Sequence, residues 1–501
     1  MSDALQALKA RLADVHHLSM AGAVLDWDQQ TYMPAGGVSA RADQKATLSK
    51  LSHQLFTDDK TGTLLAQAEA DLKGLPEDHN DAALLRMARR DYDKATRLPE
   101  ALVEEISRVT SHAQEEWAKA RAANDYGAFA PWLERIVDLE RRTAEALGYE
   151  ERLYDALLDQ YEPGMTSRRL DEIFGELKRQ TVPLVQAIAE NADAVDASVL
   201  QRDYDEEKQR HFAESVLRDC GFDFSRGRQD RSVHPFCTHF SQNDVRLTTR
   251  YDRNFVSMAL FGSLHEMGHG LYEQGVSPEL EGTLLSNGAS LALHESQSRL
   301  WENLVGRSRR FWNHYYPRFQ ETFGATVSDV PVEAFYRAMN KSGPSLIRVE
   351  ADEVTYNLHI ILRYEMENEL LEGRLSVADA PDAWNAKMQE LLGLTPPDNR
   401  EGILQDVHWS IGIMGYFPTY SLGNVLSVQL FNKAVEDVPS ILEEIEQGQF
   451  SSLLHWLRAN VHRHGRKYLP EELIRRATGS PLTVQPYADY LRSKFGELYG
   501  A

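Results

Sequence analysis

The sequence contains only two cysteines, Cys220 and Cys237, among its 501 residues. So few thiols exclude a framework of several disulfides and a zinc site built mainly from cysteine. Sparse cysteine is also typical of proteins that work in a reducing compartment. We therefore expect a cytoplasmic protein.

Long apolar runs are absent as well. No uninterrupted stretch approaches the roughly 20 apolar residues that a bilayer crossing needs. The opening residues, MSDALQALK, do not have the basic and then apolar order of a signal peptide. We expect a soluble protein without a membrane partner.

The sequence has fewer basic residues than acidic ones. Lysine and arginine number 54 against 76 acidic residues, which gives a formal net charge of −22. Such an acidic chain is a poor partner for nucleic acid, because phosphate binding needs clustered basic residues.

The sequence also has no linker rich in Gly, Ser or Pro and no internal repeat. We expect one contiguous domain over residues 1–501 rather than two independent ones.

Helical patterns dominate the chain and predict a mostly α-helical fold. Apolar residues recur at spacings of three and four between charged ones, which is the pattern of an amphipathic helix. Pro34 and the glycines that follow it separate the first two helices. The predicted helices of the N-terminal half cover residues 3–19, 39–55, 81–96, 99–122, 128–147, about 167–192 and about 204–220.

The region between residues 233 and 251 is the exception to the helical pattern. Residues 233–240 and 245–251 are rich in β-branched and aromatic side chains, and a turn at 242–244 joins them, which predicts a β-hairpin. A helix over about 253–275 follows directly. The hairpin either pairs an edge strand with an extended peptide or only covers the core.

The helix after the hairpin carries His265, Glu266 and His269. Residues four apart share a helix face, so the two imidazoles can point at one metal ion. Glu266 is turned off that line and can act as a general base. Two histidines with an adjacent glutamate are typical of zinc metallopeptidases, although a surface helix with two solvated histidines has the same pattern.

A catalytic zinc site needs a third protein ligand and leaves a fourth position for water. Glu295 is the best candidate, because a second, antiparallel helix over 289–304 would bring it back over the histidine pair. His294 competes for this role, but neighbouring helical residues point about 100° apart, so both can hardly bind one ion.

Several separated motifs resemble the carboxypeptidase Taq, or M32, family of metallocarboxypeptidases, in the family's order and over nearly the whole chain. The motifs are His234-Pro235-Phe236, Asp244-Val245-Arg246-Leu247-Thr248, the segment 265–269, His294-Glu295-Ser296-Gln297, Ile347-Arg348-Val349-Glu350-Ala351-Asp352, and the segment 402–409 with sequence GILQDVHW.

This resemblance implies that His265, His269 and Glu295 are the metal ligands and that Glu266 is the general base. It also implies a large helical metallopeptidase fold with a deep substrate groove, a homodimer, and Zn²⁺ that Co²⁺ can replace. Residues 1–501 would then form one catalytic domain, in which residues 1–230 form one wall of the groove and 231–501 carry the metal site. The expected substrates are peptides with a free C-terminal carboxylate.

Further roles follow from chemistry and general likeness to related helical metallopeptidases. His408 and Tyr420 are candidates for stabilising the oxyanion, and the alternatives are a packed histidine and a core tyrosine. A guanidinium can bind the substrate carboxylate through paired hydrogen bonds. Arg348 is the leading candidate, because it lies in the Ile-Arg-x-x-Ala-Asp pattern of the family that the chain resembles. Arg246 is the second choice, unless it only pairs with Asp244. His234 either contacts substrate or braces the strand.

The main hypothesis is therefore a zinc-dependent carboxypeptidase of broad specificity that acts on short or unstructured peptides. An endo-acting oligopeptidase with the same metal chemistry is the nearest alternative. A catalytically silent peptide-binding scaffold is less favoured, because a binding module has no use for a general base at Glu266.

Overall fold

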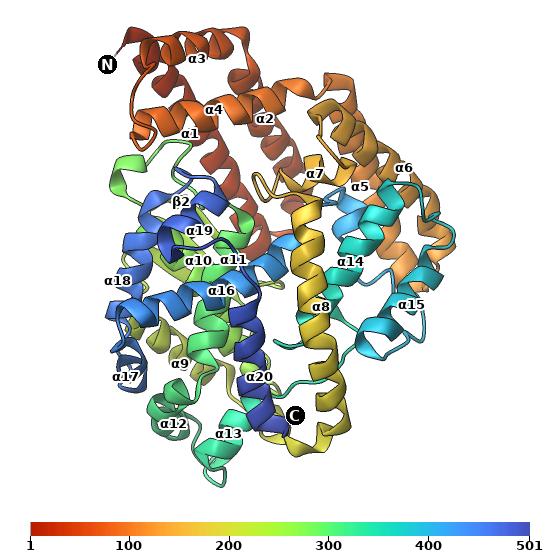
Figure 1. Ribbon diagram of the computed structural model, residues 1–501, viewed down its shortest axis with the longest axis vertical. Coiled ribbons are helices and arrows are strands. Elements are labelled where there is room, and N and C mark those ends of the chain that lie inside the picture. Colours follow the sequence, from red (N-terminus) through yellow and green to blue (C-terminus); the bar gives the residue numbers. More distant parts are fainter. Residues whose placement is uncertain (1, 501) are drawn as a thin grey trace. The chain divides into compact units, whose positions relative to one another are not determined.

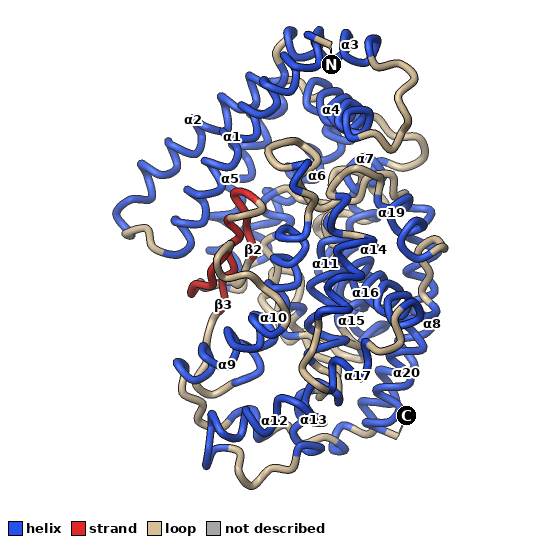
Figure 2. The backbone as a smooth tube through the Cα atoms, turned by 90° about the vertical axis from the view of Figure 1, so that its left-hand side faces the viewer, coloured by secondary structure: helices blue, strands red, loops and turns tan. Residues whose placement is uncertain are grey.

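The computed structural model describes residues 2–500 and is mostly α-helical, with one small sheet in this part of the chain (Figures 1 and 2). This confirms the predicted fold class. None of the described helices is both long and apolar enough to cross a membrane. The chain forms two compact units, each assembled from three separate stretches of sequence.

The first unit combines residues 2–96, 197–340 and 430–481. Its helices and strands are α1 (Asp3–Thr31), α2 (Val38–Thr57), α3 (Asp59–Asp71), α4 (Asn80–Arg97), α9 (Glu206–Asp219), β1 (Gly227–Arg231), β2 (Cys237–Ser241), β3 (Asp244–Thr249), α10 (Val256–Gly275), α11 (Leu291–Arg299), α12 (Arg309–Phe323), α13 (Val332–Met339), α17 (Ile441–Glu446), α18 (Ser451–Asn460) and α19 (Pro470–Thr478).

The second unit combines residues 97–196, 341–429 and 482–500. Helix α16 (Pro418–Asp437) begins in this unit and ends in the first. The other helices of the second unit are α5 (Glu100–Ala123), α6 (Tyr126–Leu147), α7 (Leu153–Leu158), α8 (Ser167–Glu190), α14 (Tyr356–Leu371), α15 (Ala380–Leu392) and α20 (Gln485–Tyr499). A single catalytic domain over 1–501 therefore stays a prediction.

The predicted helices of the N-terminal half are all present, and two of their details differ. Helix α1 continues to Thr31, twelve residues beyond the predicted end at 19, and buries Trp27 in its last turns. Helices α3 and α7 were not predicted from the sequence. The break between the first two helices lies at Pro34, as expected, because proline has no amide hydrogen to continue a helix.

The sheet contains the predicted hairpin and one further strand. Strands β2 and β3 pair antiparallel, while β1 pairs parallel to the other side of β3, so that the order is β1-β3-β2. The first hairpin strand begins at Cys237 rather than Val233, whose side chain is 73% exposed in the preceding loop. Strand β2 is thus an edge strand, and its pairing with a peptide stays a prediction.

Helix α10 lies between the sheet and helix α11. Leu247 of β3 is fully buried and packs so tightly on α10 that a Cβ added at Gly270 would lie 2.9 Å from its Cδ2 atom. Close packing against the sheet therefore fixes this face of α10, the helix that carries the two histidines of the site.

Candidate metal centre

Helices α10 and α11 come unusually close at Gly268, which lies between the two histidines. A Cβ atom added at Gly268 would be 2.5 Å from the carbonyl oxygen of Gln297 and 2.6 Å from the Cα atom of Ser298. Both of these are backbone atoms that cannot rotate away. Glycine therefore allows the two backbones to approach, and this approach brings Glu295 beneath the histidine pair.

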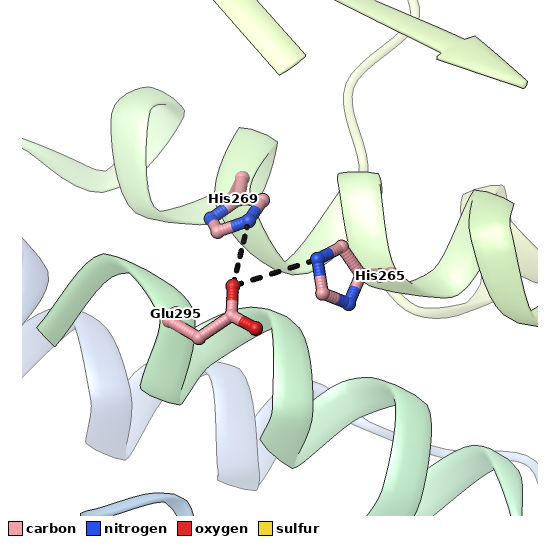
Figure 3. Close-up of side chains that lie close together, drawn as sticks. All are labelled: His265, His269 and Glu295. Carbon is pink, nitrogen blue, oxygen red and sulfur yellow. Dashed lines mark ion pairs between the residues drawn. The ribbon is translucent and has the colours of Figure 1, made fainter. Parts of the chain in front are cut away.

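The structure brings His265, His269 and Glu295 together (Figure 3). The Nε2 atoms of both histidines lie 3.5 Å from the same carboxylate oxygen, Oε2 of Glu295. Ligands about 2.0–2.1 Å from a tetrahedral zinc ion are about 3.4 Å apart. One nitrogen from each histidine and one oxygen from Glu295 therefore fit a single small metal ion.

Two charged side chains hold His265 and Glu295 in place. The Nδ1 atom of His265 lies 2.9 Å from Oε2 of Glu302, and it must donate because a carboxylate only accepts. The Nε2 atom is then free to bind metal. Arg299 donates to Oε1 of Glu295 at 2.7 Å and also reaches Glu302. The other oxygen, Oε2, accepts from the hydroxyl of Ser298 at 3.1 Å and is the one that faces the two histidines.

Glu302 owes its position to a π-helical segment, Leu300–Gly306, that continues helix α11. Wider π-helical turns inside helices are frequent at functional sites. Burial opposes charge on Glu302, but Arg299 and His265 outweigh this and lower the pKa of the carboxyl. Glu302 therefore stays an anion that can accept from His265.

His294 does not join the cluster of ligand atoms. Its Nδ1 atom lies 2.6 Å from Nδ1 of His269, and its Nε2 atom lies 2.6 Å from Oε1 of Glu273. Both ring nitrogens are thus used in hydrogen bonds. His294 is therefore outside the group of side chains whose atoms could hold one ion, and Glu295 stays the favoured candidate for the third ligand.

Glu266 follows His265 on α10 and is only 6% exposed. Burial raises the pKa of Glu266, because a carboxylate is poorly stabilised away from water, and His265 opposes this shift. The carboxylates of Glu295 and Glu302 add to the increase, and the pKa is about 7. A group with a pKa near neutrality can both take and return a proton.

The second unit brings Arg348, Asp406 and Arg363 together in a buried cluster. Arg348 donates to Oδ1 of Asp406 through Nε at 3.0 Å and through Nη2 at 2.7 Å. Arg363, whose side chain is fully buried, donates from Nε to Oδ2 at 2.6 Å. One carboxylate thus serves two guanidinium groups, and these three side chains together carry one net positive charge.

His408 and Tyr420 lie in the same part of the second unit. The ring of His408 packs on Phe417 at 4.4 Å between centroids and lies 6.4 Å from the ring of Tyr420. Burial lowers the pKa of His408 to about 4, although Asp406 opposes the shift. At neutral pH His408 is therefore an uncharged ring that can still donate one hydrogen bond.

The two remaining candidates lie in the first unit, near the sheet. Arg246 of β3 donates to both oxygens of Asp244, at 2.6 and 3.0 Å, and its guanidinium lies 4.4 Å from the ring centroid of Trp27. The pairing that the sequence offered as an alternative is therefore present. His234 is exposed in the loop between β1 and β2.

Two buried carboxyl groups hold the loop that carries His408. Glu367 accepts from the indole of Trp409 at 2.9 Å and from the backbone of Gly415 at 3.1 Å. Glu140 accepts from the backbone of Met414. Burial raises the pKa of Glu140 to about 8 and that of Glu367 to about 7, and the nearby Glu367 adds to the increase at Glu140.

Replacing Glu140 with glutamine should make stability less sensitive to alkaline pH. The raised pKa means that the folded protein holds a proton that the unfolded chain releases above about pH 4.5, so the free energy of unfolding falls as pH rises from there to about 8. In Glu140→Gln this fall should shrink by about 1–4 kcal/mol. Urea unfolding at about pH 5 and about pH 8 measures the fall in the free energy of unfolding between these two pH values. The exposed Glu134→Gln on the same helix is the control. If the free energy of unfolding of Glu140→Gln fell with pH as much as that of wild type, buried Glu140 would not hold a proton in the folded protein.

Sequence reasoning missed the side chains that surround the candidate ligands. Glu302 contacts His265, Arg299 contacts Glu295, and Glu273 contacts His294 behind His269. Each of the three is one of many charged residues in its region. Arg363 was not predicted either, because it lies 43 residues from Asp406 in the sequence and its helical surroundings do not distinguish it. The one local signal was Arg299, four residues after Glu295 on the same helix face.

Two histidines and one carboxylate oxygen that fit a single ion, with a buried glutamate beside them on a helical scaffold, define a metallopeptidase. Comparison with known proteins narrows the class. Residues 7–495 match the family described as Carboxypeptidase Taq (M32) metallopeptidase. The chain belongs to this family, and it is a metallocarboxypeptidase.

Similar proteins cover the chain almost completely. It is 44% identical over 496 residues to thermostable carboxypeptidase 1 of Thermus thermophilus, with 97% of this chain and 96% of that protein covered. Identity to carboxypeptidase 1 of Bacillus subtilis is 41% over 488 residues, with 97% of each covered. The crystal structure of the M32 carboxypeptidase from Deinococcus radiodurans R1 superposes with a TM-score of 0.97 at 43% identity, covering 100% of both chains.

Proposed function

We propose that the protein is a zinc-dependent carboxypeptidase of broad specificity that removes C-terminal residues one at a time from short or unstructured peptides. The observation that carries this proposal is the placement of His265 and His269, whose Nε2 atoms face one oxygen of Glu295 at 3.5 Å. This geometry suits three protein ligands with a fourth position left open for reaction.

The donor set supports zinc as the ion. Two imidazole nitrogens and one carboxylate oxygen suit Zn²⁺, and Co²⁺ accepts similar ligands. Calcium and magnesium prefer six or more oxygen ligands. Arg299 occupies the second oxygen of Glu295, which further disfavours such ions.

The residues of the site have complementary roles in the proposed reaction. A bound zinc ion would polarise the scissile carbonyl and lower the pKa of water. Glu266 takes the proton of the attacking water and delivers it to the departing amine. His408 and Tyr420 donate hydrogen bonds to the oxyanion that develops in the transition state, which stabilises charge that is absent from the substrate.

Arg348 is proposed to bind the free carboxylate of the substrate. Its guanidinium belongs to the cluster with one net positive charge, and a substrate carboxylate would neutralise this charge. Because a buried unpaired charge is costly, such a cluster favours an anionic ligand. Arg246 and His234 are proposed to contact the substrate outside this carboxylate subsite.

The setting of the reaction follows from the sequence and the family resemblance. We propose that the protein acts in the cytoplasm as a homodimer, with peptides as its partners. Neither nucleic acid nor a membrane is part of this proposal, in keeping with the net charge of −22.

The test is mass spectrometry of a mixed peptide digest with and without a chelator. We expect stepwise loss of single residues from C termini, loss of this activity on chelation, and recovery on adding zinc or cobalt. Cleavage that survives complete removal of metal would refute the metal chemistry. Products of internal cleavage would favour the endo-acting alternative.

A further inference from the structure

The geometry points to His294 and Glu273 as positioning residues that fix the proton of His269 on Nδ1 and so keep its Nε2 atom available to the metal ion. This inference rests on the metal site proposed above. It concerns the two side chains behind that site, neither of which lies among the three candidate ligands.

The contacts form a chain that starts at the ligand and runs away from the metal position. Nδ1 of His269 lies 2.6 Å from Nδ1 of His294, and Nε2 of His294 lies 2.6 Å from Oε1 of Glu273. The Glu273 side chain is only 4% exposed. Both contacts are short, and water has little access to the carboxylate that ends them.

Only one arrangement of protons satisfies these contacts and leaves a metal ligand. The carboxylate of Glu273 accepts, so the proton of His294 lies on Nε2. Its Nδ1 atom is then an acceptor, and His269 must donate from Nδ1. The lone pair on Nε2 of His269 therefore faces Glu295, where the ion would bind.

Packing holds His294 in this orientation. Its ring lies 5.0 Å from the ring of Tyr272, centroid to centroid. On another side, a Cβ atom added at Gly288 would lie 2.6 Å from Cδ2 of His294, so a side chain at this position would displace the ring. The hydroxyl of Tyr272 accepts from the backbone of Ala289, next to this glycine. The ring of His294 is thus fixed by its neighbours as well as by hydrogen bonds.

The two metal-facing histidines are supported differently. His265 donates directly to the carboxylate of Glu302, the usual arrangement for a metal-binding histidine. For His269 the carboxylate is one residue further away, with His294 between them. The carboxylate of Glu273 also lies 3.4 Å from Nδ1 of His239 on β2. The series of contacts that begins at His269 therefore ends at the sheet.

Two substitutions at 294 separate hydrogen bonding from packing. His294→Phe keeps a flat ring against Tyr272 but removes the acceptor, whereas the amide oxygen of His294→Asn can take the place of Nδ1. We expect His294→Phe to bind zinc about 10- to 100-fold more weakly than wild type, and His294→Asn to stay within about threefold of it. Competition with a chelating dye measures the affinity, and the visible absorption of the cobalt-loaded protein reports the ligand geometry. The exposed His53→Phe is the matched control.

The outcomes distinguish this inference from the proposed function. If wild type binds no zinc, the metal site itself is refuted. If wild type binds zinc and both variants at 294 match it, or both lose affinity equally, the positioning role of His294 is wrong. Glu273→Met keeps the volume but removes the last acceptor, so it serves as a second variant should His294→Phe not fold. It should also weaken zinc binding, and an affinity equal to wild type would overturn the role of Glu273.

Discussion

Glu266→Gln should lower kcat by about 10²- to 10⁴-fold, the range that general acid–base catalysis supplies, while zinc affinity stays near that of wild type. Glutamine has nearly the shape of glutamate but cannot take a proton from water. Glu266 is not one of the three side chains whose atoms converge on the candidate metal position, so metal binding should not depend on its charge. Steady-state kinetics with zinc analysis of the same samples measures both quantities.

The exposed Glu279→Gln, which removes a carboxylate near the end of α10, is the matched control and should keep full activity. Normal turnover in Glu266→Gln would refute the proposed base. Loss of zinc together with activity would show instead that Glu266 supports metal binding. A wild-type protein that binds zinc but cleaves no peptide would favour the silent scaffold.

Arg348→Ala should lower kcat/KM for peptides with a free C-terminal carboxylate by about 10- to 100-fold, since a charged hydrogen-bonded pair contributes about 1.5–3 kcal/mol. Any slow cleavage of amidated peptides should be unchanged, because these lack the charge that Arg348 is proposed to bind. The fold should survive, since Asp406 keeps its contacts with Arg363. Paired free-acid and amidated peptides of one sequence measure the difference.

Two further variants sharpen this test. Arg348→Lys keeps the charge but loses the planar pair of donors, so its activity should lie between wild type and Arg348→Ala. The exposed Arg374→Ala in the same unit should behave as wild type. Equal losses on both peptides would assign Arg348 a structural role. Equal cleavage of amidated peptides by wild type would identify an endo-acting enzyme.

Periodicity predicted the existence of most helices, but it did not predict where α1 ends. Leu5, Leu8 and Leu12 mark the core face of α1, but the helix runs on through residues whose exposure hides the pattern. Strand β1 has the sequence GRQDR, which has no apolar alternation. It is a strand because it pairs with the backbone of β3, and no property of these five residues predicts that pairing.

The candidate ligands were predictable because a local spacing and a family motif mark them. His265 and His269 share a helix face, and Glu295 follows in a motif of its own. The supporting residues were not predictable, because Glu302 reaches His265, and Glu273 reaches His294, only through tertiary packing. The cluster of Arg348, Arg363 and Asp406 is of the same kind, with contacts across 43 and 58 residues of sequence.

The contact at Gly268 has a consequence for how this site tolerates mutation. The separation between the helices that carry the ligands is set there by backbone touching the glycine, without an intervening side chain. Substitutions in the surrounding core can therefore cost stability while the spacing of the ligands is preserved. Even alanine at 268 would push the helices apart, and we expect this position to be as intolerant of exchange as the histidines on either side of it.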